Sequence, residues 1–383
     1  MEEALCKSTA ATRSWCKSLP KSELHAHLSG CISKEKIREI LRRPENEKLR
    51  AKATSLFSPR TSLNLKECFE LFPIIHEVIN SPAVLREVVF SVLDDFAADN
   101  VIYVELRTTP RSSDAFTPQL YISTVLEAVD SYHKEHPNGL LCRVLVSISR
   151  HLPVENAREI MKVTEAIMKE IAGTTRADLI VGLELSGNPH RGSWDDFKPI
   201  FEDSRRRLHL PISLHFGEVL DDKEANAMLD FRPSRLGHAV VLSDAVATRM
   251  ITEERNIGVE VCISSNLMTE SVTSLQEHPV VTKLLGSRHP FSLCTDDPGI
   301  LDTTLSEEYA RLSECVALSR ERVSSIALKG LQLSFCRDEN VLESLYRTFF
   351  RKLQQACCGE NATECTLANI IDRRIPAPQP LRS

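Results

Sequence analysis

The sequence predicts a (β/α)₈ barrel, in which eight parallel strands form a closed sheet inside a ring of helices. The first observation is a rhythm of eight short runs rich in apolar and β-branched residues. These runs occupy residues 22–28, 101–109, 142–149, 179–187, 211–218, 234–240, 257–266 and 290–297. The second observation is that segments with helical periodicity separate the runs. Nearly apolar strands that alternate with helices are typical of a parallel sheet.

The number of units decides between two kinds of parallel sheet. Eight strand–helix units favour a closed barrel, and an open doubly wound sheet is the alternative. Neither G-x-G-x-x-G nor G-x-x-x-x-G-K-[ST] follows any of the runs. The open nucleotide-binding sheet is therefore the weaker prediction.

The helical segments follow the strands in order along the chain. They lie at residues 81–100, 121–136, 154–173, 193–207, 222–230, 244–256 and 275–287. Residues 43–64 are charged and rich in helix breakers, which predicts a long excursion over the surface, and 306–370 are expected to form helices outside the barrel. The expected fold is an α/β (β/α)₈ TIM barrel with extra helices inserted after strand 1 and at the C-terminus. We expect one domain over 17–372, with flexible tails at 1–16 and at the Pro-rich 373–383.

The composition argues against several classes of function. A net charge of −6 and a pI near 6.1 lack the basic character of nucleic-acid-binding proteins. The N-terminus has no secretory apolar region, and no run of about 18 apolar residues predicts a membrane span. The 12 cysteines include no C-x-x-C pair, which favours a cytosolic protein with reduced thiols. We expect a monomer without nucleic-acid or membrane partners.

Ionisable residues gather where the predicted strands end. His25 and His27 end the first strand, His215 lies on the fifth and Asp296 ends the eighth. Residues i and i+2 of a strand point to the same side, and the strand ends of a barrel meet at one face. Three imidazoles and one carboxylate are a ligand set that suits Zn²⁺ with an open position for water. The fourth strand has no lysine to bridge two metals, so a single ion is expected.

Three further residues are candidates for proton transfer or water binding beside that metal. Glu218 follows His215 by three residues, His238 follows Gly237 on the sixth strand, and Asp297 follows Asp296. A carboxyl group with a raised pKa or a positioned imidazole would move protons at a metal-bound water. Each has a structural alternative: a solvated loop Glu, a core His, and a turn Asp before Pro298.

The motifs resemble those of the adenosine/AMP deaminase family of metal-dependent amidohydrolase barrels. "ELHAHLSG", "SLHFGEV", "RLGHAV", "CISSN" and "CTDDPG" occur in that order between about residues 19 and 340. The resemblance implies that zinc is held by His25, His27, His215 and Asp296. It implies that Glu218 protonates purine N1 and that His238 orients and deprotonates the zinc-bound water. It also implies substrate contacts from His27, Gly187 and Asp297.

Within the family, the chain is most similar to the adenosine deaminase-like branch of N6-methyl-AMP deaminases. "LPKSELHAHL", "VELRTTPR" and "LELSGNP" carry this likeness, which implies a purine nucleoside 5′-monophosphate as substrate. Ser29 stands where adenosine deaminases have an Asp that would repel a phosphate, although the branch itself usually has Asn there. The expected phosphate contacts are Ser29, His76, Thr108, Thr109, Pro110, Arg111 and Arg150. The arginines are alternatively surface loop charges, and His76 is alternatively part of an amphipathic helix.

The reaction implied by the resemblance is attack of zinc-bound hydroxide on purine C6. It would convert N6-methyl-AMP to IMP and methylamine. The main alternative is an adenosine deaminase that acts on the free nucleoside, and AMP, adenine or a non-purine substrate are others within the same barrel chemistry. An alternative of another class is a catalytically silent nucleotide-binding protein. Filled catalytic positions argue against that alternative.

Overall fold

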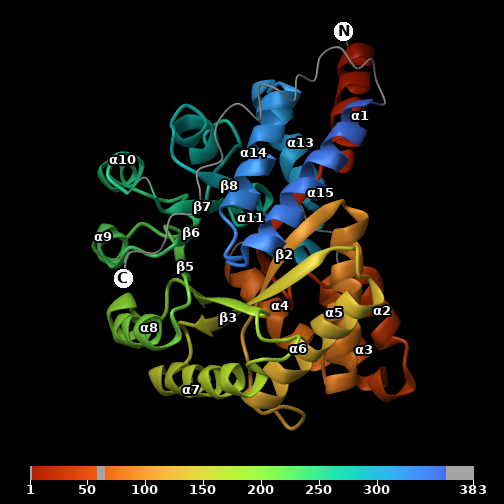
Figure 1. Ribbon diagram of the computed structural model, residues 1–383, viewed down its shortest axis with the longest axis vertical. Helices are drawn as coiled ribbons and strands as arrows, with labels where there is room; N and C mark the ends of the chain where they lie inside the picture. Colours follow the sequence, from red (N-terminus) through yellow and green to blue (C-terminus); the bar gives the residue numbers. More distant parts are fainter. Residues whose placement is uncertain (1, 58–64, 255, 359–383) are drawn as a thin grey trace.

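The computed structural model describes residues 2–57, 65–254 and 256–358 and confirms the predicted barrel. Eight strands pair in parallel in chain order, inside the helices that Figure 1 shows around them. The strands are β1 (Lys21–His27), β2 (Val101–Thr108), β3 (Leu141–Ser149), β4 (Ile180–Ser186), β5 (Ile212–Phe216), β6 (Arg235–His238), β7 (Gly258–Val261) and β8 (Phe291–Leu293). Nearly all their residues are buried, as expected for a sheet that is covered on both faces.

The barrel closes between β8 and β1 through the residues that follow β8. Ala26 and Asp296 form an isolated parallel bridge. The His27 amide donates to the Asp296 carbonyl at 3.0 Å, and the Asp296 amide donates to the His25 carbonyl at 2.8 Å. The segment that carries the two histidines is thereby held against the segment that carries the aspartate.

Several helices around the barrel begin at a residue whose side chain caps a free backbone amide. Ser81 accepts from the Val84 amide, and Asp221 accepts from the Glu224 amide. The ring consists of α5 (Pro82–Ala98), α6 (Pro118–Glu135), α7 (Val154–Ile171), α8 (Trp194–Leu208), α9 (Asp222–Phe231), α10 (Asp244–Thr252), α11 (Ile263–Met268) and α12 (Pro298–Leu301). No helix of the described residues is long and apolar enough to cross a bilayer.

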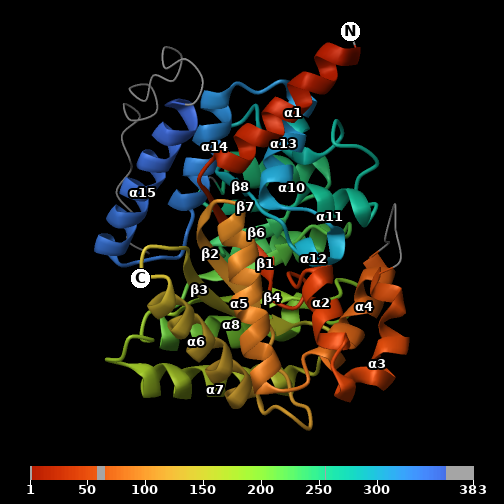
Figure 2. The same ribbon diagram turned by 90° about the vertical axis from the view of Figure 1, so that its right-hand side faces the viewer.

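Additional helices occur at the two places that the sequence predicts. After β1 come α2 (Lys34–Leu41), η1 (Pro44–Asn46), α3 (Glu47–Lys52), η2 (Ala53–Phe57) and α4 (Leu65–Val78), with residues 58–64 outside the described part. After α12 come α13 (Leu305–Val316), α14 (Arg320–Gln332) and α15 (Glu339–Cys358). α14 contacts β1 and β8, whereas α2 to α4 lie at the opposite end of the molecule in Figure 2.

Two boundaries differ from the expectation. The seventh apolar run does not continue as a strand to residue 266, because β7 ends at Val261 and α11 begins at Ile263. Residues 1–16, expected as a flexible tail, lie largely in helix α1 (Glu2–Ser18), which packs on α13. Trp15 and Cys16 of this helix are buried, so the last turn of α1 belongs to the core. The expected tail at 373–383 lies outside the described residues.

The interior of the barrel holds a buried ion network where apolar side chains are usual. Arg235 donates to Glu260 at 2.6 Å and to Glu105 at 2.5 Å. Arg107 donates to Glu184 at 2.5 Å and to Glu260 at 2.8 Å. Each charge therefore has a partner, which offsets the free-energy cost of removing it from water.

Candidate active site

The four predicted metal ligands converge at the C-terminal ends of the strands. Nε2 of His27 lies 3.2 Å from Nε2 of His215 and 3.4 Å from Oδ1 of Asp296. Nε2 of His25 lies 3.4 Å from the same Asp296 oxygen. Ligand atoms around a tetrahedral Zn²⁺ are about 3.3 Å apart, because each lies about 2.0–2.1 Å from the ion. The spacing of these atoms fits one such ion.

The burial of these groups also fits a cation between them. Nε2 of His25 is buried and makes no hydrogen bond among the described residues. Burial opposes ionisation of Asp296, but the close imidazoles of His25, His238 and His27 hold the pKa of this carboxyl well below its usual range. An ionised carboxylate and an unpartnered ring nitrogen are the donors that a metal ion requires.

Two buried carboxylates orient two of the histidines. Nδ1 of His25 donates to Oε2 of Glu260 at 2.6 Å, and Nδ1 of His215 lies 2.9 Å from Oε1 of Glu184. Burial by itself would raise the pKa of the Glu184 and Glu260 carboxyls. The charge of Arg107, which donates a hydrogen bond to each, instead holds both pKa values well below their usual range. A carboxylate at Nδ1 leaves Nε2 free for a metal, which is the usual outer-shell arrangement of histidine ligands.

The backbone is strained at two site residues. His238 has a φ of 66° and Asp296 has a φ of 66°, both in the left-handed region that ordinary side chains rarely occupy. Strain of this kind persists where the surroundings fix the conformation, and it turns a side chain away from the strand direction. At the ends of β6 and β8 it accompanies side chains that turn into the barrel mouth.

The candidate acids lie beside this cluster. Nε2 of His238 is 3.9 Å from Oε1 of Glu218. Burial, reinforced by the charge of Asp296, raises the pKa of Glu218. Burial and Asp296 likewise raise the pKa of Asp297 well above its usual range. Oδ1 of Asp297 is buried without a hydrogen-bond partner, and a Cβ on Gly30 would lie 1.7 Å from it, so only glycine fits there.

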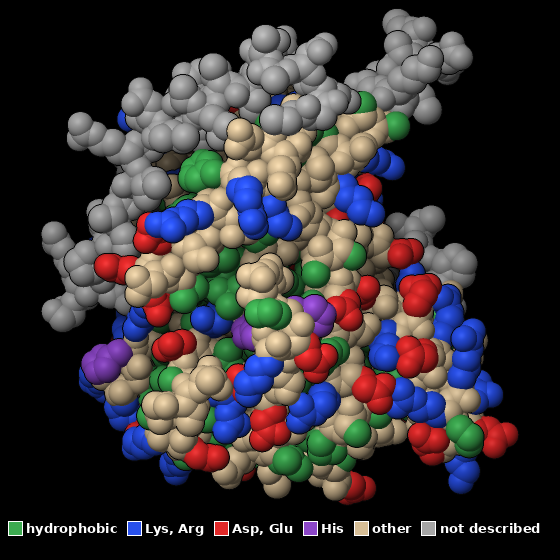
Figure 3. Space-filling model, turned by 45° about the vertical axis from the view of Figure 1, so that its right-hand side comes forward, with side chains coloured by type: hydrophobic (Ala, Val, Ile, Leu, Met, Phe, Trp, Pro, Cys, Tyr) green, Lys and Arg blue, Asp and Glu red, His purple; other side chains and the backbone are tan. Residues whose placement is uncertain are grey.

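The predicted phosphate contacts lie on loops and on α4. Arg111 donates to the carbonyls of His76 and Ile79, at 3.3 and 2.9 Å, and has no carboxylate partner within the described residues. Thr108 is buried at the end of β2, where its hydroxyl lies 3.0 Å from that of Tyr121. Of the residues around them, Ser29 and Thr109 are half-buried and Pro110 is buried. Figure 3 shows acidic and basic side chains intermixed over one face of the molecule.

Arg150 differs from Arg111 because a carboxylate already binds it, and its expected contact with a phosphate stays a prediction. Its guanidinium is buried and binds both carboxylate oxygens of Glu224, at 2.6 and 2.9 Å. It also donates to the carbonyls of Arg191 and Gly192. This bidentate pair fixes the loop before α8 to α9. The sequence could not show it, because Glu224 lies 74 residues further along the chain.

Gly187 takes the position that a close backbone approach requires. It follows β4 with a φ of 97°, and a Cβ there would lie 2.5 Å from the Ser149 hydroxyl and 3.0 Å from Nδ1 of His151. Both the conformation and the space exclude a side chain. This strand end therefore requires a glycine beside Ser149 and His151.

The sequence did not predict the residues that hydrogen-bond to the proposed metal ligands and to His238. Glu184 and Glu260 are charges in the middle of apolar strands, and that signal could have revealed them. Ser265 donates to Oδ2 of Asp296 at 2.7 Å, and Nδ2 of Asn266 lies 3.1 Å from Nδ1 of His238. Both belong to the segment that was expected to be a strand, where their side chains would have pointed to opposite faces.

The chain matches the adenosine deaminase family model over residues 20–347. It belongs to this family. It is therefore a hydrolytic deaminase. The N6-mAMP deaminase of Arabidopsis thaliana is 34% identical over 353 residues, which cover 85% of this chain and 95% of the relative.

Other relatives agree with this assignment. The adenosine deaminase-like protein of Drosophila melanogaster is 33% identical over 329 residues, covering 85% of this chain and 94% of the relative. The solved structure of Arabidopsis ADAL complexed with IMP is 33% identical, covers 89% of this chain and 99% of its own, and superposes with a TM-score of 0.80. The family's barrel is therefore preserved along nearly the whole length of these relatives.

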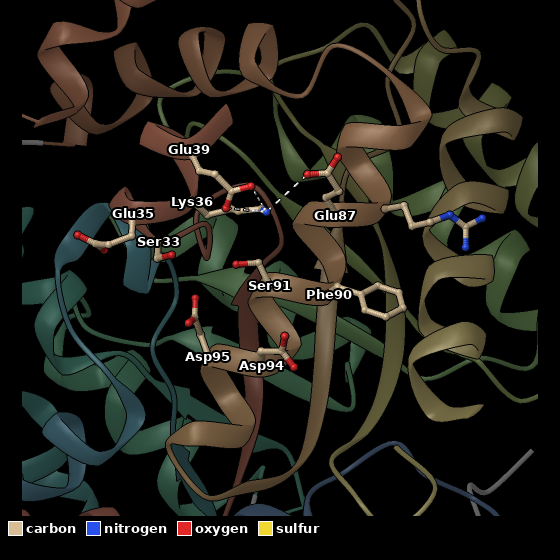
Figure 4. Close-up of a pocket in the computed structure, with 10 residues that line it drawn as sticks. Ser33, Glu35, Lys36, Glu39, Glu87, Phe90, Ser91, Asp94 and Asp95 are labelled. Atoms are coloured by element: carbon tan, nitrogen blue, oxygen red, sulfur yellow. Dashed lines mark hydrogen bonds and ion pairs between the residues drawn. The ribbon is translucent and has the colours of Figure 1, made fainter. Parts of the chain in front are cut away.

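A hollow lies away from the predicted site residues, between α2 and α5. Its volume is about 590 Å³, and Figure 4 shows its acidic lining, which includes Glu35, Asp94 and Asp95. Lys36 inside it already pairs with Glu39 and Glu87. None of the predicted catalytic or substrate-binding residues lines this hollow, so it is no part of the candidate active site.

Proposed function

We propose that this deaminase is zinc-dependent and converts N6-methyl-AMP and water to IMP and methylamine. The observation that carries the proposal is the set of ligand atoms 3.2 and 3.4 Å apart beside a carboxyl group with a raised pKa. A relative named N6-mAMP deaminase is 34% identical, and the ADAL structure in complex with IMP supports a nucleotide product.

The donor set favours one Zn²⁺ per subunit. His25, His27, His215 and Asp296 would hold it, because neutral imidazole nitrogens and a carboxylate are the ligands of catalytic zinc sites. When bound, the ion would lower the pKa of a water toward about 7 and supply the nucleophile at neutral pH. Glu260 and Glu184 keep the ring nitrogens of His25 and His215 aimed at this position.

The chain's own residues would carry the protons. Glu218 donates a proton to purine N1 while water adds to C6, since its raised pKa keeps the acid form present. His238 and Asp297 hold the attacking water by hydrogen bonds. The C6 carbon becomes tetrahedral, and one proton of the added water passes to the methylamino nitrogen. The bond from C6 to that nitrogen then breaks and methylamine leaves, while the remaining proton of the former water returns to Glu218 as the C6 carbonyl forms.

Arg111 carries the argument for a phosphate on the substrate. Its donors to His76 and Ile79 are both directed at backbone carbonyls, so its positive charge is not compensated by any described carboxylate. A phosphate dianion would supply that compensation through charge-assisted hydrogen bonds. Ser29 and Thr109 would add neutral hydroxyl donors that do not repel it.

A free-nucleoside substrate is the second candidate, and one observation favours it. The ion pair between Arg150 and Glu224 compensates the charge of one of the cations expected at the phosphate. If adenosine is the substrate, Arg111 serves only to cap the carbonyls at the end of α4.

The deciding experiment compares four substrates side by side. Purified protein receives N6-methyl-AMP, AMP, adenosine and N6-methyladenosine, and the purine absorbance is followed. Turnover confined to N6-methyl-AMP is the expected result. Turnover of adenosine in preference to the nucleotide would overturn the substrate assignment and leave the deaminase chemistry in place.

A further inference from the structure

A chain of three hydrogen bonds runs from the backbone of η3 (Val280–Leu284) to His238. The Val280 amide lies 3.0 Å from Nδ1 of His278. Nε2 of His278 lies 3.1 Å from Oδ1 of Asn266, and Nδ2 of Asn266 lies 3.1 Å from Nδ1 of His238. The three side chains are 1–3% exposed, so water does not compete for these bonds. The reaction scheme above makes no use of Asn266 or His278.

The backbone amide of Val280 decides which atom donates in each of the three hydrogen bonds. A backbone N–H can only donate, so Nδ1 of His278 must accept from Val280 and carries no proton. Burial lowers the pKa of His278 to about 4, so the ring is neutral at pH 7. Its single proton is therefore on Nε2, from which it donates to Oδ1 of Asn266. The amide nitrogen of Asn266 is left to donate to His238.

We propose that Asn266 and His278 are positioning residues that fix the tautomer of His238, with Nδ1 bare and the proton on Nε2. The role of these residues in turnover rests on the proposed function. Nε2 is the nitrogen nearer Glu218, at 3.9 Å from its carboxyl oxygen, so the N–H is directed at the mouth. His238 then donates a hydrogen bond to the attacking water, and it does not take a proton at Nε2.

The same tautomer separates His238 from the metal ligands. His238 lies close enough to His25, His215 and Asp296 to complete a four-ligand cluster with them. A metal requires a bare ring nitrogen, and Nε2 of His238 carries a proton in this arrangement. The hydrogen-bond chain therefore keeps His238 out of the coordination sphere, and His27 is left as the third histidine ligand.

The local fold supports a shared positioning role for α11. Ser265 and Asn266 are consecutive residues of this short helix. Ser265 donates to Asp296 at 2.7 Å, and Asn266 donates to His238. Both targets have left-handed backbone conformations, so α11 binds the side chains of the two strained residues.

The test begins with the tautomer itself and requires neither substrate nor metal. Protein labelled with ¹⁵N-histidine is studied by two-bond ¹H–¹⁵N correlation spectra, which distinguish the two neutral tautomers. The His238→Gln variant identifies the signal by its loss. We expect wild-type His238 to be protonated on Nε2. A signal showing Nδ1 protonation would overturn the proposal.

The isosteric variant Asn266→Asp reverses the direction of the hydrogen bond between residue 266 and His238. A carboxylate accepts from His278 and also from His238, so the proton of His238 moves to Nδ1. A wrong histidine tautomer costs about 10⁴-fold in kcat in a serine protease, and we expect a loss of about 10²–10⁴-fold here with little change in KM. An unchanged tautomer in this variant would overturn the proposal. So would an unchanged kcat with the tautomer reversed.

A second pair of variants guards against simple misfolding. His278→Gln keeps a donor for Oδ1 of Asn266, whereas His278→Leu removes it. We expect His278→Leu to show mixed tautomers and a lower kcat, and His278→Gln to restore both the signal and most of the turnover. His289→Leu changes another buried histidine that takes no part in these three hydrogen bonds, and it should alter only the melting temperature. Equal losses in both His278 variants, with the His238 tautomer intact, would show a merely structural role and overturn the proposal.

The two proposals fail in different ways. If wild-type protein has the expected tautomer but does not deaminate N6-methyl-AMP, the tautomer assignment stands and the proposed substrate falls. If the nucleotide is deaminated but His238 is protonated on Nδ1, the substrate stands and the positioning role falls.

Discussion

The two halves of the active-site mouth are built differently. In the metal half, His25, His215 and Asp296 each contact a buried second residue, which is Glu260, Glu184 or Ser265. In the half that we propose to bind the phosphate, Ser29 and Arg111 are half-buried on loops, and Arg111 has no carboxylate partner among the described residues. The proposed chemistry therefore rests on strand ends that other side chains hold, whereas the proposed phosphate contacts rest on loop residues.

The largest effect is expected from removing a metal ligand. His215→Ala deletes one of the three imidazoles of the proposed zinc site. A catalytic metal contributes several kcal/mol to transition-state stabilisation, so turnover should fall by about 10³-fold or more. Metal content by atomic emission should fall in parallel. Full metal content with normal turnover would show that the four residues are no metal site.

A substitution of Glu218 tests whether this residue is the proton donor of the reaction. Glu218→Gln keeps the size of the side chain but removes its proton donor, and kcat should fall by about 10²–10⁴-fold. Metal content and melting temperature serve as controls and should be unchanged. Wild-type turnover in this variant would remove Glu218 from catalysis.

The pH profile gives the same residue a second test. Burial and Asp296 raise the pKa of Glu218, so the protonated form persists to a higher pH than for an exposed glutamate. A proton donor is active below its pKa, and kcat/KM should therefore decrease as pH rises through the raised value. The decrease should be absent in Glu218→Gln. A wild-type profile with no such limb would contradict the assigned role.

A smaller loss is expected from the residues behind the ligands. Glu260→Gln replaces the acceptor of His25 by an amide and leaves Arg107 and Arg235 with one fewer carboxylate. Loss of such an outer-shell partner typically costs about 10–100-fold in metal affinity or activity. Zinc affinity by competition with a chelator measures it. An unchanged zinc affinity would mean that His25 binds the metal without help from Glu260.

The phosphate half should respond through substrate preference. Arg111→Gln removes the uncompensated charge, and kcat/KM for N6-methyl-AMP should fall by about ten-fold or more, since hydrogen bonds to charged groups contribute about 1.5–3 kcal/mol. The value for N6-methyladenosine should not change. Equal losses on both substrates would point to a structural role in holding α4.

The smallest effect is expected at Ser29. Ser29→Asn and Ser29→Asp have nearly the same size and differ by one charge. The Asn variant should raise kcat/KM for the nucleotide by about three-fold, within the usual range for one neutral hydrogen bond. The Asp variant should lower it by repulsion of the phosphate. If both variants behave alike on nucleotide and nucleoside, Ser29 does not face the phosphate.

The sequence by itself determined the barrel and predicted the residues of the proposed metal cluster. A strand repeats every two residues, so the H-x-H pair had to share a face, and eight alternating units had to bring their strand ends together. The extra helices after the first strand and at the C-terminus were also predicted from the sequence.

Only the tertiary structure decided which polar residues act on which others. Three contacts join residues that are far apart in the chain: Arg150 with Glu224, Glu260 with His25, and Asn266 with His238. The burial of Trp15 likewise depends on distant parts of the chain. Periodicity reports only the face on which a side chain lies. A hydrogen bond depends on distances of a few tenths of an ångström between separate strands and loops, and these are fixed only when the barrel has closed.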